Sequence, residues 1–447
     1  MWLRRLLGAA AVAVLLAPGC DLANPAGSSG FEPSRLPVGR LEIGVWLPAG
    51  MGPQVRLDGA RLTGLGITHL EWLQRADVEG VSAEALAMEL CSATGLRMPV
   101  YYEPPGYSPY DKLRNWATKR EVATGFDDSV RARAAALVGR WGGQAGLAGY
   151  LVGHEDYSRH VYPALTRTVR ILGQADPGRP AYAVGHIDSY PRRGQFLEAF
   201  FTEGGAANVF QHEHYVFRAG TPTSGRGLQG RLDELAAGYS RVAQAVQGRH
   251  GRWHAIVQAH AETRDGEAYY RKPEPAELRV QAGLALARGA GGILYFLYSS
   301  GEERVLDGEG ELVQVRQYDG LVDVEGEPTP AYRAAAELNA RLAALAPVLE
   351  PLHFHGGYRA DKVPASAPLR RGNADLDVGF FGDRGAVSHA LVVNRLTQGE
   401  RTVQLEAPNH GLADALTGAT LGEGVVLQAG GFRLIRLTPR QEEMPDD

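Results

Sequence analysis

The feature that most limits the possible folds is an alternation of short apolar runs with helical patterns, which continues from residue 41 to residue 350. Each run has the length of a strand and is bounded by turn residues. The eight runs are Leu41–Leu47, Thr68–Leu73, Met98–Glu103, Ala148–Gly153, Ala181–Gly185, Asn208–His212, His254–Ala259 and Gly291–Tyr298. Eight strands separated by helices fit a closed barrel better than an open sheet. The sequence therefore predicts an α/β chain in which residues 41–350 form a (β/α)₈ barrel.

Amphipathic segments lie between these runs, as the barrel requires. The clearest are Ser129–Trp141, Tyr162–Gln174, Leu228–Gln247 and Glu274–Arg288. The helix that follows the second run is expected within Ala83–Thr94. Apolar residues recur in these segments at the helical period, which indicates helices that pack one face on the barrel.

The pattern changes after the eighth run. Gly301–Pro330 is expected to be irregular, and Ala331–Leu345 is expected to form a helix. Short apolar runs then alternate with Gly, Asn and Asp turns, which is typical of antiparallel sheets. These runs are Val378–Phe381, Ser388–Val393, Thr402–Leu405, Gly424–Leu427 and Phe432–Leu437. Residues 351–447 are therefore predicted to form a small antiparallel β-sandwich.

The N-terminus has the pattern of an export signal. Arg4 and Arg5 precede the apolar stretch Leu6–Ala17, which is too short to span a bilayer comfortably and is typical of a signal peptide. The ending Ala17-Pro18-Gly19-Cys20 resembles a bacterial lipobox. The resemblance implies that residues 1–19 are removed and that Cys20 is lipidated. An ordinary signal peptide that is cleaved nearby is the alternative.

Residues 20–40 are expected to form a flexible tether, because they are rich in Pro, Gly, Ser and Asn and have no hydrophobic period. Together with lipidation, this predicts an exported protein of the bacterial cell envelope that is anchored to the membrane through its N-terminal lipid only. The pattern does not predict the oligomeric state.

Charge and cysteine content argue against a nucleic-acid-binding protein and against a disulfide-stabilised fold. Removal of Arg4 and Arg5 leaves 44 basic against 51 acidic residues, a net charge of −7, so a nucleic-acid partner is not expected. Cys91 is the only cysteine besides Cys20, so an internal disulfide is not expected. Cys91 lies in a helical pattern and is interpreted as a small buried hydrophobic residue.

The residues at the ends of the predicted strands are unusually polar and aromatic. Barrel enzymes place their reactive groups just beyond the C-terminal ends of the strands. The residues in question are Trp46, Glu71, Trp72, Tyr101, Tyr102, Glu103, His154, Glu155, Asp156, His186, Asp188, Gln211–Tyr215, Gln258–Glu262, Tyr295, Phe296 and Tyr298. Aromatic rings offer flat apolar faces to sugars, and carboxylates bind hydroxyls or act as acid, base or nucleophile. This combination predicts a carbohydrate site.

Several segments resemble the glycoside-hydrolase barrels of bacterial lipoproteins. They are Leu147–Asp156 at the fourth strand, Asp176–Pro180 before the fifth, Glu274–Phe296 at the last helix and eighth strand, Gly320–Asp323 and Pro328–Pro330 at the barrel exit, and Leu391–Asn394 and Asp414–Gly418 in the appended sandwich. The resemblance covers most of the chain after the signal. It implies a glycosidase that acts on oligo- or polysaccharide at the cell envelope.

The resemblance also implies catalytic roles. In the retaining glycosidases of this kind an acid/base Glu follows strand four, a position that Glu155 occupies, and a nucleophilic Glu follows strand seven. Strand seven of this chain ends instead in Gln258, which cannot attack an anomeric carbon. The expected second carboxylate is Glu262, with Glu213 and then Glu103 as alternatives. A barrel that binds glycans without cutting them remains open.

Further strand-end residues are expected to bind the sugar. Tyr215, Trp46 and Tyr102 are expected to form an aromatic platform, whereas histidines and Gln258 would bind hydroxyls. The full predicted set is Trp46, Glu71, Tyr102, Glu103, His154, Asp156, His212, His214, Tyr215, Gln258, His260 and Tyr298.

His212 and His214 also allow a metal-dependent hydrolase as an alternative, because a spacing of two places both imidazoles on one side of an extended chain. Metal-dependent barrel hydrolases usually carry such a pair at strand one, where this chain has none. The histidines are therefore interpreted as hydrogen-bonding groups, and no metal is expected. No cofactor is expected either, because we identify neither a phosphate-loop motif nor a dinucleotide-binding fingerprint.

Overall fold

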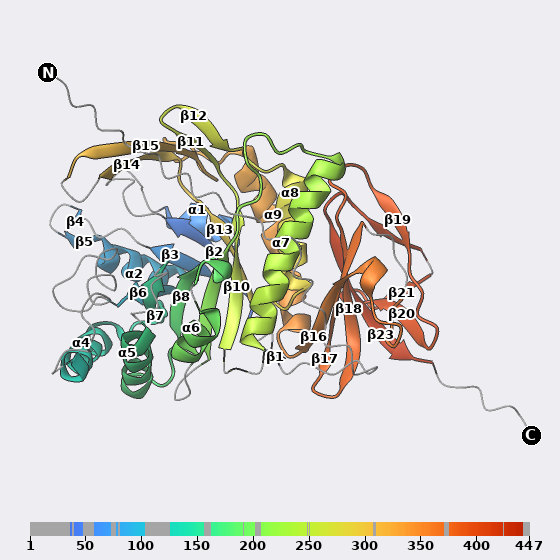
Figure 1. Cartoon of the computed structure of the whole chain (residues 1–447), viewed down its shortest axis with the longest axis horizontal. Coiled ribbons are helices and arrows are strands. Elements are labelled where there is room, and N and C mark those ends of the chain that lie inside the picture. Colours follow the sequence, from blue (N-terminus) through green and yellow to red (C-terminus); the bar gives the residue numbers. More distant parts are fainter. Residues whose placement is uncertain are drawn as a thin grey trace, which may run out of the picture.

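The computed structural model describes residues 36–37, 40–47, 58–72, 77–78, 81–102, 126–155, 162–190, 192–201, 207–247, 249, 251–306, 310–370, 375–422 and 424–440. Cys20, Glu103 and Asp156 lie outside the described residues. Figure 1 shows a ring of strands beside a C-terminal sheet domain, with long helices between the two. The chain is thus a (β/α)₈ barrel followed by a β-sandwich, and the predicted fold class is confirmed.

Eight parallel strands form the barrel. They are β2 (Glu42–Leu47), β3 (His69–Trp72), β6 (Met98–Tyr101), β7 (Leu147–His154), β8 (Ala181–Gly185), β9 (Asn208–Glu213), β10 (Gly251–Gln258) and β13 (Gly292–Phe296). Their order is β3-β2-β13-β10-β9-β8-β7-β6. A parallel bridge between His69 and Arg97 brings the two ends of this sheet together, and the amide of Leu70 donates to the carbonyl of Arg97 at 2.9 Å.

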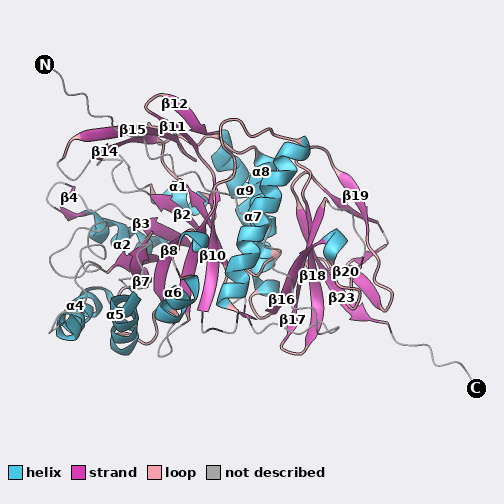
Figure 2. Ribbon diagram, viewed as in Figure 1, coloured by secondary structure: helices cyan, strands magenta, loops and turns pink. Residues whose placement is uncertain are grey.

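Helices cover the outside of the barrel and separate it from the C-terminal sheet (Figure 2). They are α1 (Gly59–Gly64), α2 (Ala83–Thr94), α4 (Phe126–Trp141), α5 (Tyr162–Ala175), η3 (Ile187–Ser189), α6 (Arg193–Phe200), α7 (Gly225–Val246), α8 (Pro275–Leu286) and α9 (Pro330–Leu349). Helix α8 begins where Glu274 and Glu277 form a capping box and Pro275 takes the first helical position. Among the described residues, no helix is both long and apolar enough to cross a membrane.

The barrel wall separates two hydrophobic clusters because side chains alternate along each strand. One cluster fills the barrel interior and includes Trp46, Leu151, Tyr182, Ile256 and Leu294. The larger cluster lies between the strands and the helices. At the end of each strand, side chains therefore point alternately to the barrel mouth and to the outer layer; we call this alternation the parity of the residue.

A four-stranded accessory sheet lies beside the barrel mouth. Its strands are β11 (Ala261–Arg264), β12 (Glu267–Tyr270), β14 (Gly301–Leu306) and β15 (Leu312–Asp319), in the order β12-β11-β15-β14. The prediction that Gly301–Pro330 is irregular is therefore wrong for the residues of β14 and β15, whereas residues 320–329 contain no helix or named strand. Most side chains of β15 are exposed or half-buried, so its sequence lacks the one-sided apolar pattern by which strands are recognised.

The C-terminal domain packs one large antiparallel sheet against a two-stranded sheet. The strands of the large sheet are β16 (His353–Arg359), β17 (Leu376–Asp383), β18 (Ala386–Asn394), β20 (His410–Asp414), β21 (Thr420–Leu421) and β23 (Phe432–Pro439), and those of the small sheet are β19 (Arg401–Gln404) and β22 (Gly424–Leu427). Strand β1 (Leu36–Pro37), within the predicted tether, pairs antiparallel with β16.

Buried charges connect this domain to the barrel helices. The carboxylate of Asp377 on β17 is fully buried between Arg288, which follows α8, and Arg395, which follows β18. Nη1 of Arg395 lies 2.8 Å from Asp377 Oδ2, and its Nη2 lies 2.7 Å from Oδ1 of Asp233 on α7. The interface between the two domains therefore contains a hydrogen-bonded charge network as well as apolar contacts.

Candidate functional site

Strand β9 provides both an inner and an outer group of polar side chains. Gln211 contacts Glu71 inside the barrel, and Tyr215 packs against the interior cluster, so Glu213 between them faces the barrel mouth. His212 and His214 have the opposite parity and lie toward α7, where His212 contacts Tyr239. A period of two thus divides a stretch that the sequence analysis assigned to a single site.

An aromatic cluster of Tyr215, His260, Tyr270, Phe296 and Tyr318 lies at the mouth. The ring of Tyr215 stacks on Phe296 at 5.5 Å and meets His260 edge-on at 5.3 Å and Tyr270 at 5.9 Å. Tyr318 meets His260 at 5.9 Å. Because Tyr215, Tyr270 and Phe296 remain partly exposed, the cluster offers apolar ring faces to a ligand.

Two carboxylates act on the same tyrosine of this cluster. Glu155 ends β7 with an exposed side chain and a left-handed backbone (φ 53°), and its amide donates to the carbonyl of Val184 at 2.9 Å. Glu213 is half-buried on the inner side of β9. Burial, followed by the carboxylates of Glu213 and Glu155, raises the pKa of Tyr215 well above its usual value. Strands four and six therefore bring two acidic groups toward one aromatic surface.

Glu262 lies on the other side of the aromatic cluster, on the accessory sheet rather than on a barrel strand. Its side chain is 4% exposed, and its Oε1 accepts a hydrogen bond of 2.5 Å from Nε of Arg264. Its Oε2 lies 3.9 Å from Nε2 of His260. The carboxylate is thus already held by a charged partner.

Gln258 ends β10, where the resemblance would place a nucleophile, and it is fully buried. Its Oε1 accepts from the amide of Phe217 at 3.0 Å, and its Nε2 donates to the carbonyls of Phe217 and Arg271 at 3.1 and 3.0 Å. The amide group therefore fastens the loop after β9 to the start of α8, with its hydrogen bonds directed to the main chain.

Trp46 and His154 occupy the opposite part of the barrel interior. Their rings are 5.6 Å apart, and Trp46 is 1% exposed. Burial lowers the pKa of His154, so its imidazole is neutral at neutral pH. These residues support the inner wall next to Glu155.

A chain of buried polar groups lies deeper in the barrel. Nδ1 of His69 is 3.3 Å from Oε2 of Glu42, and its Nε2 is 2.7 Å from Oε1 of Glu71. Arg97 contacts Glu42 at 3.0 Å, and Gln211 donates to Glu71. Glu71, which the sequence analysis assigned to substrate binding, is fully buried in this chain one pleat below Glu213. It is placed to hold the barrel floor in position.

The charges of this chain predict how stability depends on pH. Burial opposes ionisation of His69, but the carboxylates of Glu42 and Glu71 outweigh this effect and raise the pKa of His69. Burial also opposes ionisation of Glu42, but His69 and the other nearby cations lower the pKa of Glu42 to about 2. A raised histidine pKa contributes stability that is fully present below the unfolded value of about 6.5 and is lost as the pH rises through the folded value. The Glu42 contribution is lost only as the pH falls toward 2.

We expect the free energy of unfolding of the wild-type protein to fall more between about pH 6 and about pH 9 than that of the His69→Gln variant, which has no proton to lose there. Urea denaturation followed by circular dichroism at both pH values measures this difference. Equal changes in the two proteins would contradict a charged His69 in the folded state.

Two of the predicted sugar-binding residues, Tyr102 and Tyr298, lie away from the mouth. Tyr102 is 2% exposed in the outer cluster, where the charge of Arg133 on α4 acts on it. Its neighbour Tyr101 has the opposite parity and packs against the interior cluster. Tyr298 is also in the outer cluster, near Tyr332 of α9. The structure therefore does not bring Tyr102 and Tyr298 to the site.

The sequence analysis did not select Tyr270, Tyr318 or Phe296 as site residues. Phe296 lies in a predicted strand and its side chain packs against the interior cluster. The alternation of side chains along that strand could therefore have identified it as a site residue. Tyr270 and Tyr318 come from the accessory sheet, whose strands carry no clear apolar period. Their place at the mouth depends on the pairing of β11 with β12 and β15.

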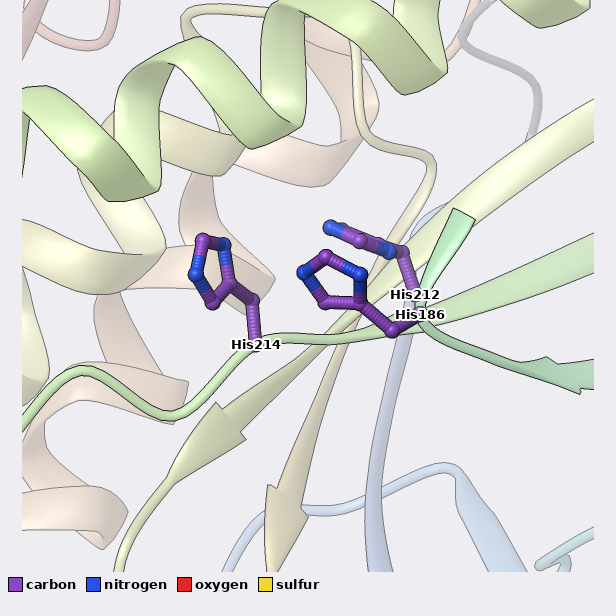
Figure 3. Close-up of side chains that lie close together, drawn as sticks. All are labelled: His186, His212 and His214. Carbon is purple, nitrogen blue, oxygen red and sulfur yellow. The ribbon is translucent and has the colours of Figure 1, made fainter. Parts of the chain in front are cut away.

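A second group of polar side chains lies outside the barrel wall. His186 follows β8, His212 lies on β9 and His214 follows it; Figure 3 shows their three imidazoles gathered together. One ring nitrogen of each lies within 4.8 Å of those of the other two. Burial, helped by the neighbouring imidazoles, lowers the pKa of His186 to about 4 and also lowers the pKa of His212 well below its usual value. Neutral imidazoles at this spacing have the chemistry to hold a divalent cation.

No protein-family model matches the chain. Among solved structures, a GH42 β-galactosidase from G. stearothermophilus aligns with a TM-score of 0.61 and 8% identity, over 92% of this chain and 100% of that chain. A β-galactosidase from Bacillus circulans sp. alkalophilus aligns with a TM-score of 0.58 and 9% identity, over 91% of this chain and 100% of that chain. A β-galactosidase from Rahnella sp. R3 aligns with a TM-score of 0.57 and 10% identity, over 90% of this chain and 99% of that chain. At such identities the likeness shows the fold alone, which is that of glycoside-hydrolase barrels.

Two curated proteins are similar to part of the chain. They are named shikimate dehydrogenase (NADP(+)), from Rhizobium meliloti (strain 1021) and Sinorhizobium medicae (strain WSM419), and each is 29% identical over 203 residues, or 44% of this chain. The chain spans 66% of the length of these relatives.

One glycine pattern bears on this similarity and was not noted in the sequence analysis. Gly225, Gly227 and Gly230 have the G-x-G-x-x-G spacing at the start of α7. In dinucleotide-binding folds this pattern follows a strand directly, whereas residues 214–224 separate β9 from α7 here. The pattern therefore lacks the strand–turn–helix context that a dinucleotide site needs.

Proposed function

We propose that this chain is a glycoside hydrolase that binds an oligo- or polysaccharide at the barrel mouth, with Glu155 as general acid/base. The observation that carries the proposal is that Glu155, directly after β7, and Glu213, the last residue of β9, lie at the C-terminal end of the barrel strands, where the aromatic cluster of Tyr215 also lies. Glycosidic hydrolysis uses a pair of carboxylates, and aromatic rings offer apolar faces to a sugar.

Glu213 is the proposed partner of Glu155, ahead of Glu262. Glu213 is the half-buried last residue of a barrel strand, and its charge acts on Tyr215 of the aromatic cluster, as that of Glu155 does. Glu262 is almost fully buried and paired with Arg264, so it would have to leave that partner to reach a sugar. Its proposed role is to hold the accessory sheet against the aromatic cluster through His260 and Arg264.

The proposed reaction needs one acid and one base or nucleophile. Glu155 donates its proton to the glycosidic oxygen while the bond from that oxygen to the anomeric carbon breaks. Glu213 either attacks the anomeric carbon or takes a proton from the attacking water. In the first case water, deprotonated by Glu155, then displaces Glu213 from the sugar and releases the product. Carboxylates about 5–5.5 Å apart favour the first route and retention, and those about 6.5–9.5 Å apart favour the second and inversion.

The test is a panel of oligo- and polysaccharides that begins with β-galactosides, because the neighbouring solved structures named above are β-galactosidases. Release of reducing sugar and binding to the same glycans are measured in parallel. Hydrolysis by the wild-type protein supports the proposal, and NMR of the first anomer formed distinguishes retention from inversion. A wild-type protein that neither hydrolyses nor binds any glycan of the panel would contradict the proposal.

Non-catalytic glycan binding is the second candidate, and Gln258 favours it. A neutral amide occupies the position of the usual nucleophile, and its hydrogen bonds to the main chain keep it there. Binding at the mouth without hydrolysis of any bound glycan would support this candidate over the first.

The location at the cell envelope is part of the proposal and rests on the lipobox-like segment Ala17–Cys20. Replacing Cys20 by Ser is expected to prevent acylation and to move the protein from the detergent phase to the aqueous phase in a partition experiment. A Cys20→Ser protein that still fractionates with membranes after a salt wash would contradict lipid anchoring.

A further inference from the structure

The histidine group outside the barrel wall (His186, His212 and His214) has ring nitrogens arranged for more than hydrogen bonding. Nε2 of His214 lies 3.4 Å from Oε1 of Glu234 on α7, so the proton of this imidazole belongs on Nε2. Its Nδ1 is buried and finds no hydrogen-bond partner among the residues that the structure describes. A carboxylate that orients one nitrogen while the other keeps a free lone pair is the usual support of a metal-binding histidine.

His212 presents a second nitrogen to the same space. This imidazole is fully buried, and its Nε2 also has no hydrogen-bond partner within the described part of the chain. The amide of Ile187 donates to its Nδ1 over 3.3 Å. To bind a cation through Nε2 the ring must carry its proton on Nδ1, which costs this one long hydrogen bond.

Helix α7 covers these nitrogens with a residue that has no side chain. A Cβ atom added to Gly238 would lie 2.7 Å from Nδ1 of His214 and 3.5 Å from Nε2 of His212. Both nitrogens therefore face the same point on the helix. Two buried imidazole nitrogens without partners in one place are costly unless a further group satisfies them.

We propose that His186, His212 and His214 bind one divalent transition-metal ion, with Zn²⁺ as the best match, and that Glu234 of α7 orients His214 for the ion. Three imidazoles are a ligand set that zinc prefers, and the fourth position is left for water. The hard ions Ca²⁺ and Mg²⁺ are excluded by the same chemistry, because they prefer oxygen ligands. His212 and His214 point away from the barrel mouth, so the proposal does not depend on the proposed function.

The experiment uses the full chain without a polyhistidine tag, stripped with a chelator and titrated with Zn²⁺ by calorimetry. We expect one ion per chain and a higher thermal unfolding midpoint, because the ion binds the folded state only. Co²⁺ serves as a second probe, since its visible absorption reports tetrahedral coordination by nitrogen. Binding in the His186→Gln/His214→Gln double variant is expected to be lost.

Two further variants separate ligation from folding. Glu234→Gln removes the negative charge beside His214, together with the exposed ion pair to Arg231, and is expected to weaken Zn²⁺ binding about 10- to 100-fold. His410→Gln, on β20 of the C-terminal domain, is the control and is expected to bind like the wild type. Circular dichroism of the stripped proteins shows whether each variant is folded. A wild-type protein that binds no stoichiometric Zn²⁺, or a folded double variant that binds it equally well, would overturn the proposal.

Discussion

Replacing Glu155 by Gln is expected to lower kcat on a natural glycan by about 10²- to 10⁴-fold, the usual contribution of a general acid. The amide keeps the size of the side chain but has no proton to donate to the leaving oxygen. Because Glu155 is exposed directly after β7, the variant is expected to fold normally. Sugar binding by the aromatic cluster should be retained, so the loss should appear in kcat rather than in KM.

The leaving group provides an internal check of this role. A nitrophenyl glycoside has a leaving group that departs without protonation, so the Glu155→Gln variant should lose much less activity on it. Loss of Glu213 should instead slow both substrates, because a nucleophile or base is needed whatever the leaving group. This contrast separates the two carboxylates by role rather than by the size of the effect.

Glu198→Gln is a matched control, because Glu198 is exposed on α6 away from the aromatic cluster. It is expected to leave turnover unchanged. If Glu155→Gln hydrolyses a natural glycan as fast as this control, Glu155 is not the acid, whichever residue supplies the proton.

The barrel could be predicted from the sequence because its strands must bury apolar side chains on both faces. The run at Ala181–Gly185 is entirely buried and coincides with β8, and the helical pattern at Ala83–Thr94 coincides with α2. A continuous apolar run or a helical period lies within a single strand or helix, so it can be recognised without knowing which element packs against it. The accessory sheet lacks such a signal, since its strands are stabilised mainly by pairing with one another.

Assignment of side chains to the site was less successful, because it depends on the parity of each strand. Tyr101 and Tyr102 are adjacent and chemically alike, but only Tyr101 faces the interior. A shift of one residue moves a side chain across the barrel wall, and the sequence does not fix that register. The spacing of two correctly placed His212 and His214 on one side of the strand, whereas the assignment of all strand-end residues to one site wrongly joined them with Glu213 and Tyr215.

Loops that return from distant elements decide the rest of the site. Glu262 ends no barrel strand, and its position relative to His260 follows from the hairpin of β11 and β12 and its pairing with β15. Gln258 is similar, because its hydrogen bonds reach Phe217 and Arg271. Such contacts across long sequence separations are absent from any local pattern.

Replacing Asp377 by Ala is expected to destabilise the folded chain by about 3–5 kcal/mol, the cost of leaving buried charges without their partner. Asp377 is fully buried, and Arg288 and Arg395 that flank it are 5% and 1% exposed. Removal of the carboxylate leaves two guanidinium groups in a site from which water is excluded. Within the described part of the chain, Arg395 retains its charged contact with Asp233, and Arg288 retains a hydrogen bond to Ser240 at 3.2 Å.

The matched control for this change is Asp361→Ala. Asp361 pairs with Arg359 at 2.7 Å, but both side chains are about a third exposed, so water screens the pair and its loss should cost no more than about 1 kcal/mol. Denaturant unfolding, followed by a probe in each domain, measures both variants. Because Asp377 connects β17 to residues after α8 and β18, its loss should also separate the unfolding of the sandwich from that of the barrel. Equal stability of the two variants would show that the buried network adds nothing beyond an exposed ion pair.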